Sequence, residues 1–188
     1  GNKNSIFVEY EEIDEEENNS DIDRAKRGTA YHIVLENIDF NSNTLDKVNS
    51  EINRLVSCGI LTEQDVQSID SNEILSILNS KVFDYARKSK CYREQEFTLY
   101  TKACDVLDTD VEDKVLVQGT IDLLIVGEEV WIVDYKKSDE SDLVLLERYK
   151  MQLKLYSIAV QKGIGRKVDK AMLFVIGSGK VIELQVDW

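Results

Sequence analysis

Two acids and one lysine stand close together in a part of the chain whose residue types suit phosphodiester chemistry. Asp122 lies inside one apolar run, and Asp134 and Lys136 follow a second run two positions apart. Side chains two apart on a strand point to the same face, so Asp134 and Lys136 would look into one site. Two carboxylates can hold a hard cation such as Mg²⁺, which makes water a better nucleophile towards phosphate. A lysine can position that water and stabilise charge on the phosphate.

The elements that must position these groups form a predicted β-hairpin. Apolar runs at Val115–Val126 and Val130–Val133 flank a Gly-Glu-Glu turn, which is a hairpin signal. Antiparallel pairing would bring Asp122 beside Asp134. An isolated Asp-x-Lys occurs often by chance, and a surface hairpin with solvated charges would explain it. However, the residues before Asp134 are typical of a buried strand, where a charge without a partner is costly.

A predicted helix at Arg24–Phe40 carries His32, the only histidine in the chain. Its apolar positions recur at helical spacing. Neutral imidazole is a good metal ligand, although an ordinary half-buried helix histidine would look the same in the sequence. Gly28 lies one turn earlier on the same face and would let another backbone or a DNA strand approach closely.

A predicted strand at Cys91–Tyr100 carries Glu96. This glutamate is a candidate acid in or behind the site. A solvent-facing strand glutamate explains it equally well.

A predicted helix at residues 142–161 presents three polar groups on one face: Tyr149, Gln152 and Tyr156. Gln152 can donate or accept hydrogen bonds, and Tyr156 can stack on a base or contact a phosphate. The alternative is a helix whose tyrosines pack with their hydroxyls outward.

The composition is that of one globular domain of 188 residues, 43% hydrophobic and 31% charged. No run of about 18 apolar residues occurs and no signal peptide is recognisable, so we expect no membrane span and a cytoplasmic protein. The three cysteines are widely spaced and would be free thiols in that compartment.

The net charge of -13 argues against simple electrostatic affinity for nucleic acid. Residues 1–23 hold nine acids and one lysine, which leaves -5 for residues 24–188. We interpret residues 1–23 as an acidic linker. The alternative is an acidic tail that mimics DNA or docks on a partner.

The element pattern predicts an α/β domain over residues 24–188, with a helical insertion at about 41–90. Within the insertion, Thr62 with Asp65 predicts a helix start, and another helix is expected over 71–83. Residues 101–114 are expected to be a polar loop. The strands expected in a small mixed sheet are 92–100, 114–126, 130–136, 170–176 and 180–186. Gly177-Ser178-Gly179-Lys180 lacks the earlier glycine and the Ser/Thr of a P-loop, so it predicts a turn and no ATP site.

The ordered motifs together resemble the RecB-family nuclease domain, which has the PD-(D/E)xK, restriction-endonuclease-like fold. They are Gly28-Thr29-x-x-His32, Glu96, Gly119-x-x-Asp122, Asp134-Tyr135-Lys136 and Tyr149-x-x-Gln152-x-x-x-Tyr156. The likeness runs from about Arg27 to the C-terminus. Its insertion, with Gly59-Ile60-Leu61-Thr62, is most similar to the AddA type found in AddAB helicase–nucleases.

The resemblance implies roles for particular residues. It implies Mg²⁺ (or Mn²⁺) ligands at His32, Asp122, Asp134 and the Tyr135 backbone carbonyl, a catalytic lysine at Lys136, and orienting groups at Gln152 and Tyr156. Gly28, Glu96 and Tyr149 would be accessory. The chain has too few cysteines for the Fe–S cluster of some relatives. Lys137 departs from the small hydroxyl residue that often follows the lysine.

The implied substrate is single-stranded DNA, cut during the processing of double-strand breaks for recombinational repair. The implied partners are the helicase part of the same full-length chain and a second, AddB-like nuclease subunit. Two alternatives stay open: a catalytically silent DNA- or partner-binding module of the same fold, and a stand-alone phage- or CRISPR-type exonuclease.

Overall fold

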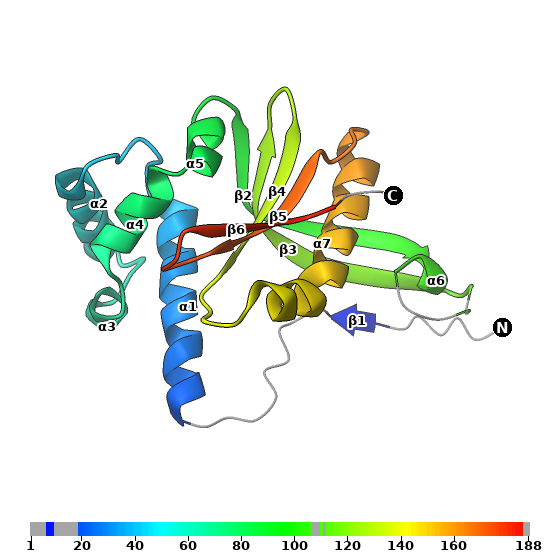
Figure 1. The fold of residues 1–188 in the computed structure, drawn as a ribbon, viewed down its shortest axis with the longest axis horizontal. Helices are drawn as coiled ribbons and strands as arrows, with labels where there is room; N and C mark the ends of the chain where they lie inside the picture. The colour runs from blue at the N-terminus through cyan, green and yellow to red at the C-terminus, as the bar shows by residue number, and fades with distance from the viewer. Residues whose placement is uncertain (1–6, 10–18, 107–109, 111, 186–188) are drawn as a thin grey trace.

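A computed structural model describes residues 7–9, 19–106, 110 and 112–185, and it is an α/β fold with a mixed sheet flanked by helices (Figure 1). The strands are β1 (Phe7–Glu9), β2 (Lys90–Lys102), β3 (Lys114–Val126), β4 (Val130–Lys136), β5 (Lys170–Val175) and β6 (Lys180–Leu184). The helices are α1 (Asn19–Asn37), α2 (Leu45–Ser57), α3 (Glu63–Gln67), α4 (Ser71–Leu78), α5 (Lys81–Ala86), α6 (Ala103–Val106) and α7 (Asp142–Ile164). The predicted fold class is confirmed.

Strand β3 organises the sheet. It pairs antiparallel with β2 along its whole length, from Lys114 to Val126. Its other edge pairs antiparallel with β4 over Leu123–Val126 and parallel with β1 over Leu116–Gln118. Strand β4 then pairs parallel with β5, which pairs antiparallel with β6. The predicted β3–β4 hairpin is therefore confirmed.

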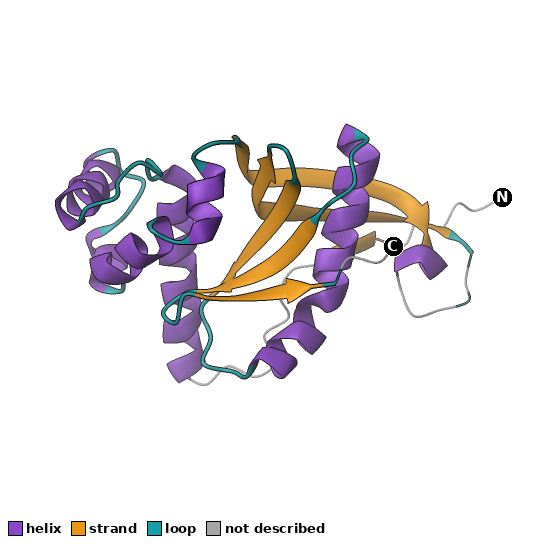
Figure 2. Cartoon of the chain, turned by 45° about the horizontal axis from the view of Figure 1, so that its top comes forward, coloured by secondary structure: helices purple, strands orange, loops and turns teal. Residues whose placement is uncertain are grey.

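Two apolar layers cover the two faces of the sheet (Figure 2). One layer joins α1, α2, α4 and α5 to sheet residues such as Leu123 and Phe174. In the other layer, α7 packs against residues such as Ile121 and Leu173. Successive β5 side chains alternate between the two layers, because neighbouring side chains on a strand point to opposite faces.

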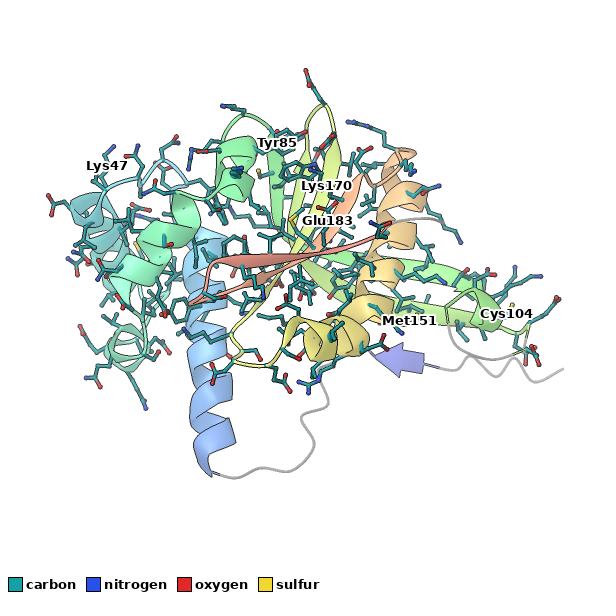
Figure 3. The ribbon with its side chains drawn as sticks, in the orientation of Figure 1. Lys47, Tyr85, Cys104, Met151, Lys170 and Glu183 are labelled. Carbon is teal, nitrogen blue, oxygen red and sulfur yellow. The ribbon has the colours of Figure 1, made fainter. Side chains whose placement is uncertain are left out.

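Contacts from outside the hairpin hold its turn in place. The hydroxyl of Tyr85, labelled in Figure 3, donates to the Glu129 carbonyl at 2.9 Å and accepts from the Glu129 amide at 2.8 Å. Arg166 donates to the carbonyls of Gly127 and Glu128 at 2.9 and 2.7 Å. Because the turn is held on both sides, the register of β3 against β4 is well specified.

The insertion differs from expectation in one respect. The helix predicted over residues 71–83 is two helices, because Asn79 caps α4 and Ser80 adopts an extended backbone before α5. The apolar residues of both helices still face one core, so the sequence spacing looked continuous. The predicted helix start at Thr62 is confirmed, with a reciprocal capping box to Asp65.

The segments predicted to be a polar loop and an acidic linker also contain helices and strands. Strand β2 extends to Lys102 and α6 follows it directly, within the segment predicted as a polar loop; residues 107–109 and 111 lie outside the described part. Within residues 1–23, the structure describes strand β1 and the start of α1, and the rest lies outside the described residues. The acidic linker stays a prediction. None of the helices in the described ranges is long and apolar enough to cross a membrane.

Candidate active site

Asp122 and Asp134 meet where β3 and β4 separate. The ladder between these strands ends at the pair Leu123–Val133, so the two acids occupy the next position in register. Beyond it, the amide of Tyr135 donates to Asp122 Oδ2 at 2.7 Å. A side-chain carboxylate thus replaces the backbone carbonyl that would continue the ladder, which satisfies a buried amide. The hairpin brings the two acids together as predicted.

The regular alternation of β3 side chains between the two faces of the sheet is broken at Asp122. Ile121 lies in the core layer of α7, whereas Leu123 lies in the layer of α1, although residues two apart on a regular strand share a face. Strand β2 is distorted at the position opposite Asp122, where Glu94 has a φ of 46°. Such a backbone is rare outside glycine. Asp122 therefore stands at a crossover, next to groups from both faces.

His32 reaches Asp122 from α1. Its Nε2 lies 3.1 Å from Asp122 Oδ2, and its Nδ1 lies 2.9 Å from the carbonyl of Gly28. A carbonyl can only accept, so Nδ1 carries a proton and Nε2 faces the carboxylate. Burial opposes the charged imidazolium, but the hydrogen bond and charge of Asp122 outweigh it and raise the pKa of His32 to about 9.

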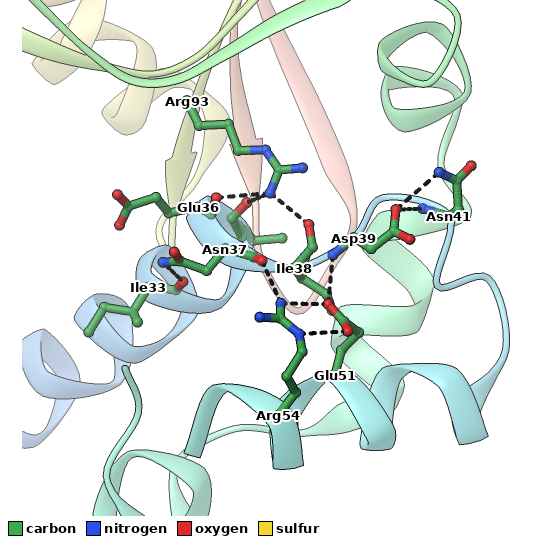
Figure 4. Close-up of polar contacts among 10 residues, drawn as sticks. Ile33, Glu36, Asn37, Ile38, Asp39, Asn41, Glu51, Arg54 and Arg93 are labelled. Carbon is green, nitrogen blue, oxygen red and sulfur yellow. Dashed lines mark hydrogen bonds and ion pairs between the residues drawn. The ribbon is translucent and has the colours of Figure 1, made fainter. Parts of the chain in front are cut away.

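Arg93 fixes the end of the helix that carries His32 (Figure 4). Its guanidinium donates to the carbonyls of Glu36 and Ile38 at 2.8 and 2.6 Å and lies 3.6 Å from the centre of the Phe40 ring. The last carbonyls of a helix lack internal partners and carry partial negative charge. This arginine on β2 therefore anchors α1 against the strand that faces Asp122.

Asp134 and Lys136 form a buried ion pair on the α7 side. Asp134 is 2% exposed, Lys136 is 7% exposed, and Lys136 Nζ lies 3.1 Å from Asp134 Oδ2. Burial raises the pKa of Asp134 to about 7, against the opposing charge of Lys136. Asp134 Oδ2 accepts no well-oriented hydrogen bond from the described residues. A buried carboxylate oxygen in this state can take a cation as a ligand.

Helix α7 brings its predicted face to this pair. Lys136 Nζ lies 4.2 Å from the centre of the Tyr149 ring. Gln152 Nε2 donates to the Tyr156 hydroxyl at 2.9 Å, and Gln152 Oε1 is buried without a hydrogen-bond partner in the described residues. Burial raises the pKa of Tyr156, as does the charge of Asp134. The three α7 side chains therefore belong to one polar cluster with the lysine.

Gly119 makes room for this cluster. A Cβ at this position would lie 2.9 Å from the Phe97 ring and 3.6 Å from Tyr156. The two rings meet edge to face, with centroids 5.5 Å apart. The glycine of the Gly119-x-x-Asp122 motif is thus required by close packing behind Tyr156. By contrast, a Cβ at Gly28 would meet nothing within 4 Å.

An acid that the sequence reasoning missed is Glu94. Burial raises its pKa to about 7, with a further contribution from the charge of Asp122 opposite. Glu96 pairs with Thr120 and its side chain is exposed, so its accessory role stays a prediction. The sequence gives no signal for the distorted backbone at Glu94. On a regular strand the two glutamates would share a face, so alternation alone could not tell them apart.

The donor set fits a hard divalent cation. No three acidic, histidine or cysteine side chains form a ready metal cluster in the described part of the chain. Instead, the groups are held as two ion pairs. His32 Nε2 and Asp122 Oδ2, 3.1 Å apart, would offer one nitrogen and one oxygen donor side by side to such a cation. The buried carboxylate of Asp134, which is ion-paired with Lys136, supplies a third donor of the right chemistry.

Comparisons with known proteins give the family to which this chain belongs. The sequence profile of the PD-(D/E)XK nuclease superfamily matches residues 7–186. The chain is 31% identical over 173 residues to an ATP-dependent helicase/nuclease subunit from Alkaliphilus oremlandii, covering 85% of this chain and 14% of that protein. It is 33% identical over 166 residues to the subunit of the same name from Clostridium botulinum, covering 81% and 13%.

A third relative, from Ruminiclostridium cellulolyticum, bears the same name and is 29% identical over 174 residues, covering 85% of this chain and 13% of that one. The chain thus spans about a seventh of the length of these relatives. The match covers nearly all of the chain, and it includes both the hairpin and α7. The chain therefore belongs to the PD-(D/E)XK nuclease superfamily and, as its motifs predict, is a RecB-family nuclease domain.

Proposed function

We propose that this domain hydrolyses the phosphodiester bonds of single-stranded DNA with the help of Mg²⁺ or Mn²⁺. It would act as an exonuclease, with endonuclease activity as a candidate second activity. The observation that carries the proposal is the meeting of Asp122 and Asp134 at the end of the β3–β4 ladder, with His32 on one side and Lys136 on the other. This arrangement joins oxygen and nitrogen metal donors to a buried ammonium.

Each group has a distinct task in the proposed site. His32, Asp122, Asp134 and the Tyr135 carbonyl would hold the cation. When bound, the ion would make water more nucleophilic and offset the charge on the phosphate. The Gly28 carbonyl keeps the Nδ1 proton of His32 in place, so Nε2 is the nitrogen available as a ligand.

Lys136 would orient the attacking water and stabilise charge on the phosphate. Its ammonium is confined between Asp134 and the Tyr149 ring, so its place is defined before substrate arrives. Gln152 and Tyr156 would orient the lysine or the DNA strand through the free oxygen of the amide.

The names of the relatives support a wider setting for the domain. They are ATP-dependent helicase/nuclease subunits of which this chain matches 13–14%. We propose that a helicase part of the same polypeptide delivers the strand, and that a second, AddB-like nuclease works beside it in double-strand break repair. A stand-alone exonuclease is the alternative, and the length of the natural chain distinguishes the two.

The first test is cleavage of end-labelled single-stranded DNA in Mg²⁺, Mn²⁺ or EDTA. We expect cutting that requires the metal and is lost in Asp134→Asn and Lys136→Met. Asp139→Asn is the matched control, because Asp139 is exposed in the loop after β4. Equal cutting by Asp134→Asn and the control would contradict the proposed site. DNA binding without cutting by a folded sample would mean either that the domain needs its motor to present the strand or that it is the silent binding module. Calorimetric titration with Mn²⁺ would then distinguish these two.

A further inference from the structure

The helical insertion contributes no group to the proposed chemistry, yet one of its carboxylates contacts the strand that does. Glu73 on α4 accepts from Lys137 Nζ through both oxygens, at 2.7 and 3.0 Å. Lys137 directly follows Lys136 at the end of β4. Both side chains are about three-quarters buried, where an ion pair is screened less by solvent than on an open surface.

The same carboxylate contacts the helix that carries His32. The hydroxyl of Tyr31 donates to Glu73 Oε2 and accepts from the amide of Asp70 at 3.0 Å. Tyr31 is fully buried and directly precedes His32. Lys137 Nζ also lies 4.9 Å from the centre of the Tyr31 ring. Glu73 thus lies between α1 and the end of β4.

The turn after β5 packs against this ion pair. A Cβ at Gly177, whose φ is 98°, would lie 3.2 Å from both Glu73 Oε1 and Lys137 Nζ. The next residue back, Ile176, donates its amide to the Lys136 carbonyl at 2.8 Å. The position of the pair is therefore set by three segments that are distant in sequence.

We infer that Glu73 is a positioning residue, which holds the His32 helix and the Asp134–Lys136 strand at the separation that the metal site needs. This inference rests on the proposed function. The insertion packs through an apolar core that it shares with α1 and the sheet, so its place in the fold does not depend on the ion pair alone. A metal site is more sensitive, because a displacement of about 1 Å can cost up to about 100-fold in rate.

The test is a double-mutant cycle with Glu73→Gln and Lys137→Met. Each variant breaks the ion pair and should lower the single-turnover cleavage rate and the Mn²⁺ affinity about tenfold. The double variant should lose little more than either single one, because the two side chains act through one contact. Glu51→Gln is the matched control: Glu51 is also an insertion carboxylate, pairing with Arg54 at 2.8 Å and accepting from the Asp39 amide at 2.9 Å (Figure 4).

The imidazole NMR signals of His32 give a readout that does not need activity. The chain has a single histidine, so these signals are unambiguous. In metal-free protein, Glu73→Gln and Lys137→Met should shift them, whereas Glu51→Gln should not. If Glu73→Gln, Lys137→Met and the double variant all match wild type in His32 signals and Mn²⁺ affinity, the inference is overturned. If wild-type protein does not cut DNA, the proposed function fails, yet the signals and the affinity still decide the role of Glu73.

Discussion

The amide of Tyr135 donates to the carboxylate of Asp122 at 2.7 Å, one step beyond the last backbone pair of β3 and β4. The same oxygen lies 3.1 Å from His32 Nε2. Asp122 Oδ2 therefore accepts the hydrogen bond of the Tyr135 amide where the two strands separate, and it also pairs with the His32 side chain of α1. Strand separation and site formation at this point depend on the same residue.

The first prediction concerns pH and the His32–Asp122 pair in metal-free protein. The pKa of His32 is raised to about 9 in the folded state, above its ordinary value of 6.5. A raised histidine pKa stabilises the fold fully below pH about 6.5, and this stabilisation is lost as pH rises through about 9. The free energy of unfolding, measured in EDTA, should fall over that window. Asp122→Asn should flatten the fall, and an NMR titration should place its His32 pKa well below 9. An unchanged pKa in this variant would contradict the pairing.

The second prediction concerns Gly119. Alanine there places a methyl group 2.9 Å from the Phe97 ring, so Phe97, which packs edge to face on Tyr156, must shift. We expect a loss of about 1–3 kcal/mol in the free energy of unfolding, measured with urea, together with reduced cleavage. Gly163→Ala on α7 is the control. Its Cβ meets nothing within 4 Å, so it should stabilise by up to about 1 kcal/mol. Similar effects of the two changes would refute the packing argument.

The third prediction concerns Arg93. Replacement by Met keeps much of the apolar stem but removes the hydrogen bonds to the carbonyls of Glu36 and Ile38. We expect a loss of about 2 kcal/mol in stability and weaker Mn²⁺ binding, because the end of α1 is released. Arg54→Gln provides the comparison. Arg54 also donates to an α1 carbonyl, that of Asn37, but its side chain is 46% exposed, so its loss should reduce stability much less than the loss of Arg93.

The fourth prediction concerns the ring of Tyr149, which lies against Lys136, the proposed catalytic lysine. Tyr149→Phe retains an aromatic face 4.2 Å from Lys136 Nζ, whereas Tyr149→Leu removes it. The phenylalanine variant should cleave DNA within about threefold of wild type, and the leucine variant about tenfold more slowly. Single-turnover rates at saturating Mg²⁺ separate the two. If both variants lose activity equally, the hydroxyl rather than the ring is the important group.

Local patterns were sufficient for several features. Two apolar runs around a glycine turn predicted the β3–β4 hairpin, and its register places Asp122 beside Asp134. Helical spacing predicted that Gln152 and Tyr156 share a face, and they are hydrogen bonded. These features depend on residues close in sequence, where backbone geometry alone decides which side chains are neighbours.

Other features depend on contacts between distant parts of the chain. The break between α4 and α5 and the distortion at Glu94 arise from how the elements pack, so periodicity misplaced a helix end and drew attention to Glu96 rather than Glu94. The contact between Glu73 and Lys137 joins residues 64 positions apart. The sequence by itself determined the central strands, the main helices and the residue types of the site. Only the tertiary structure decided which acid faces Asp122 and which insertion residue supports the site, because sheet distortion and helix docking depend on the whole packed core.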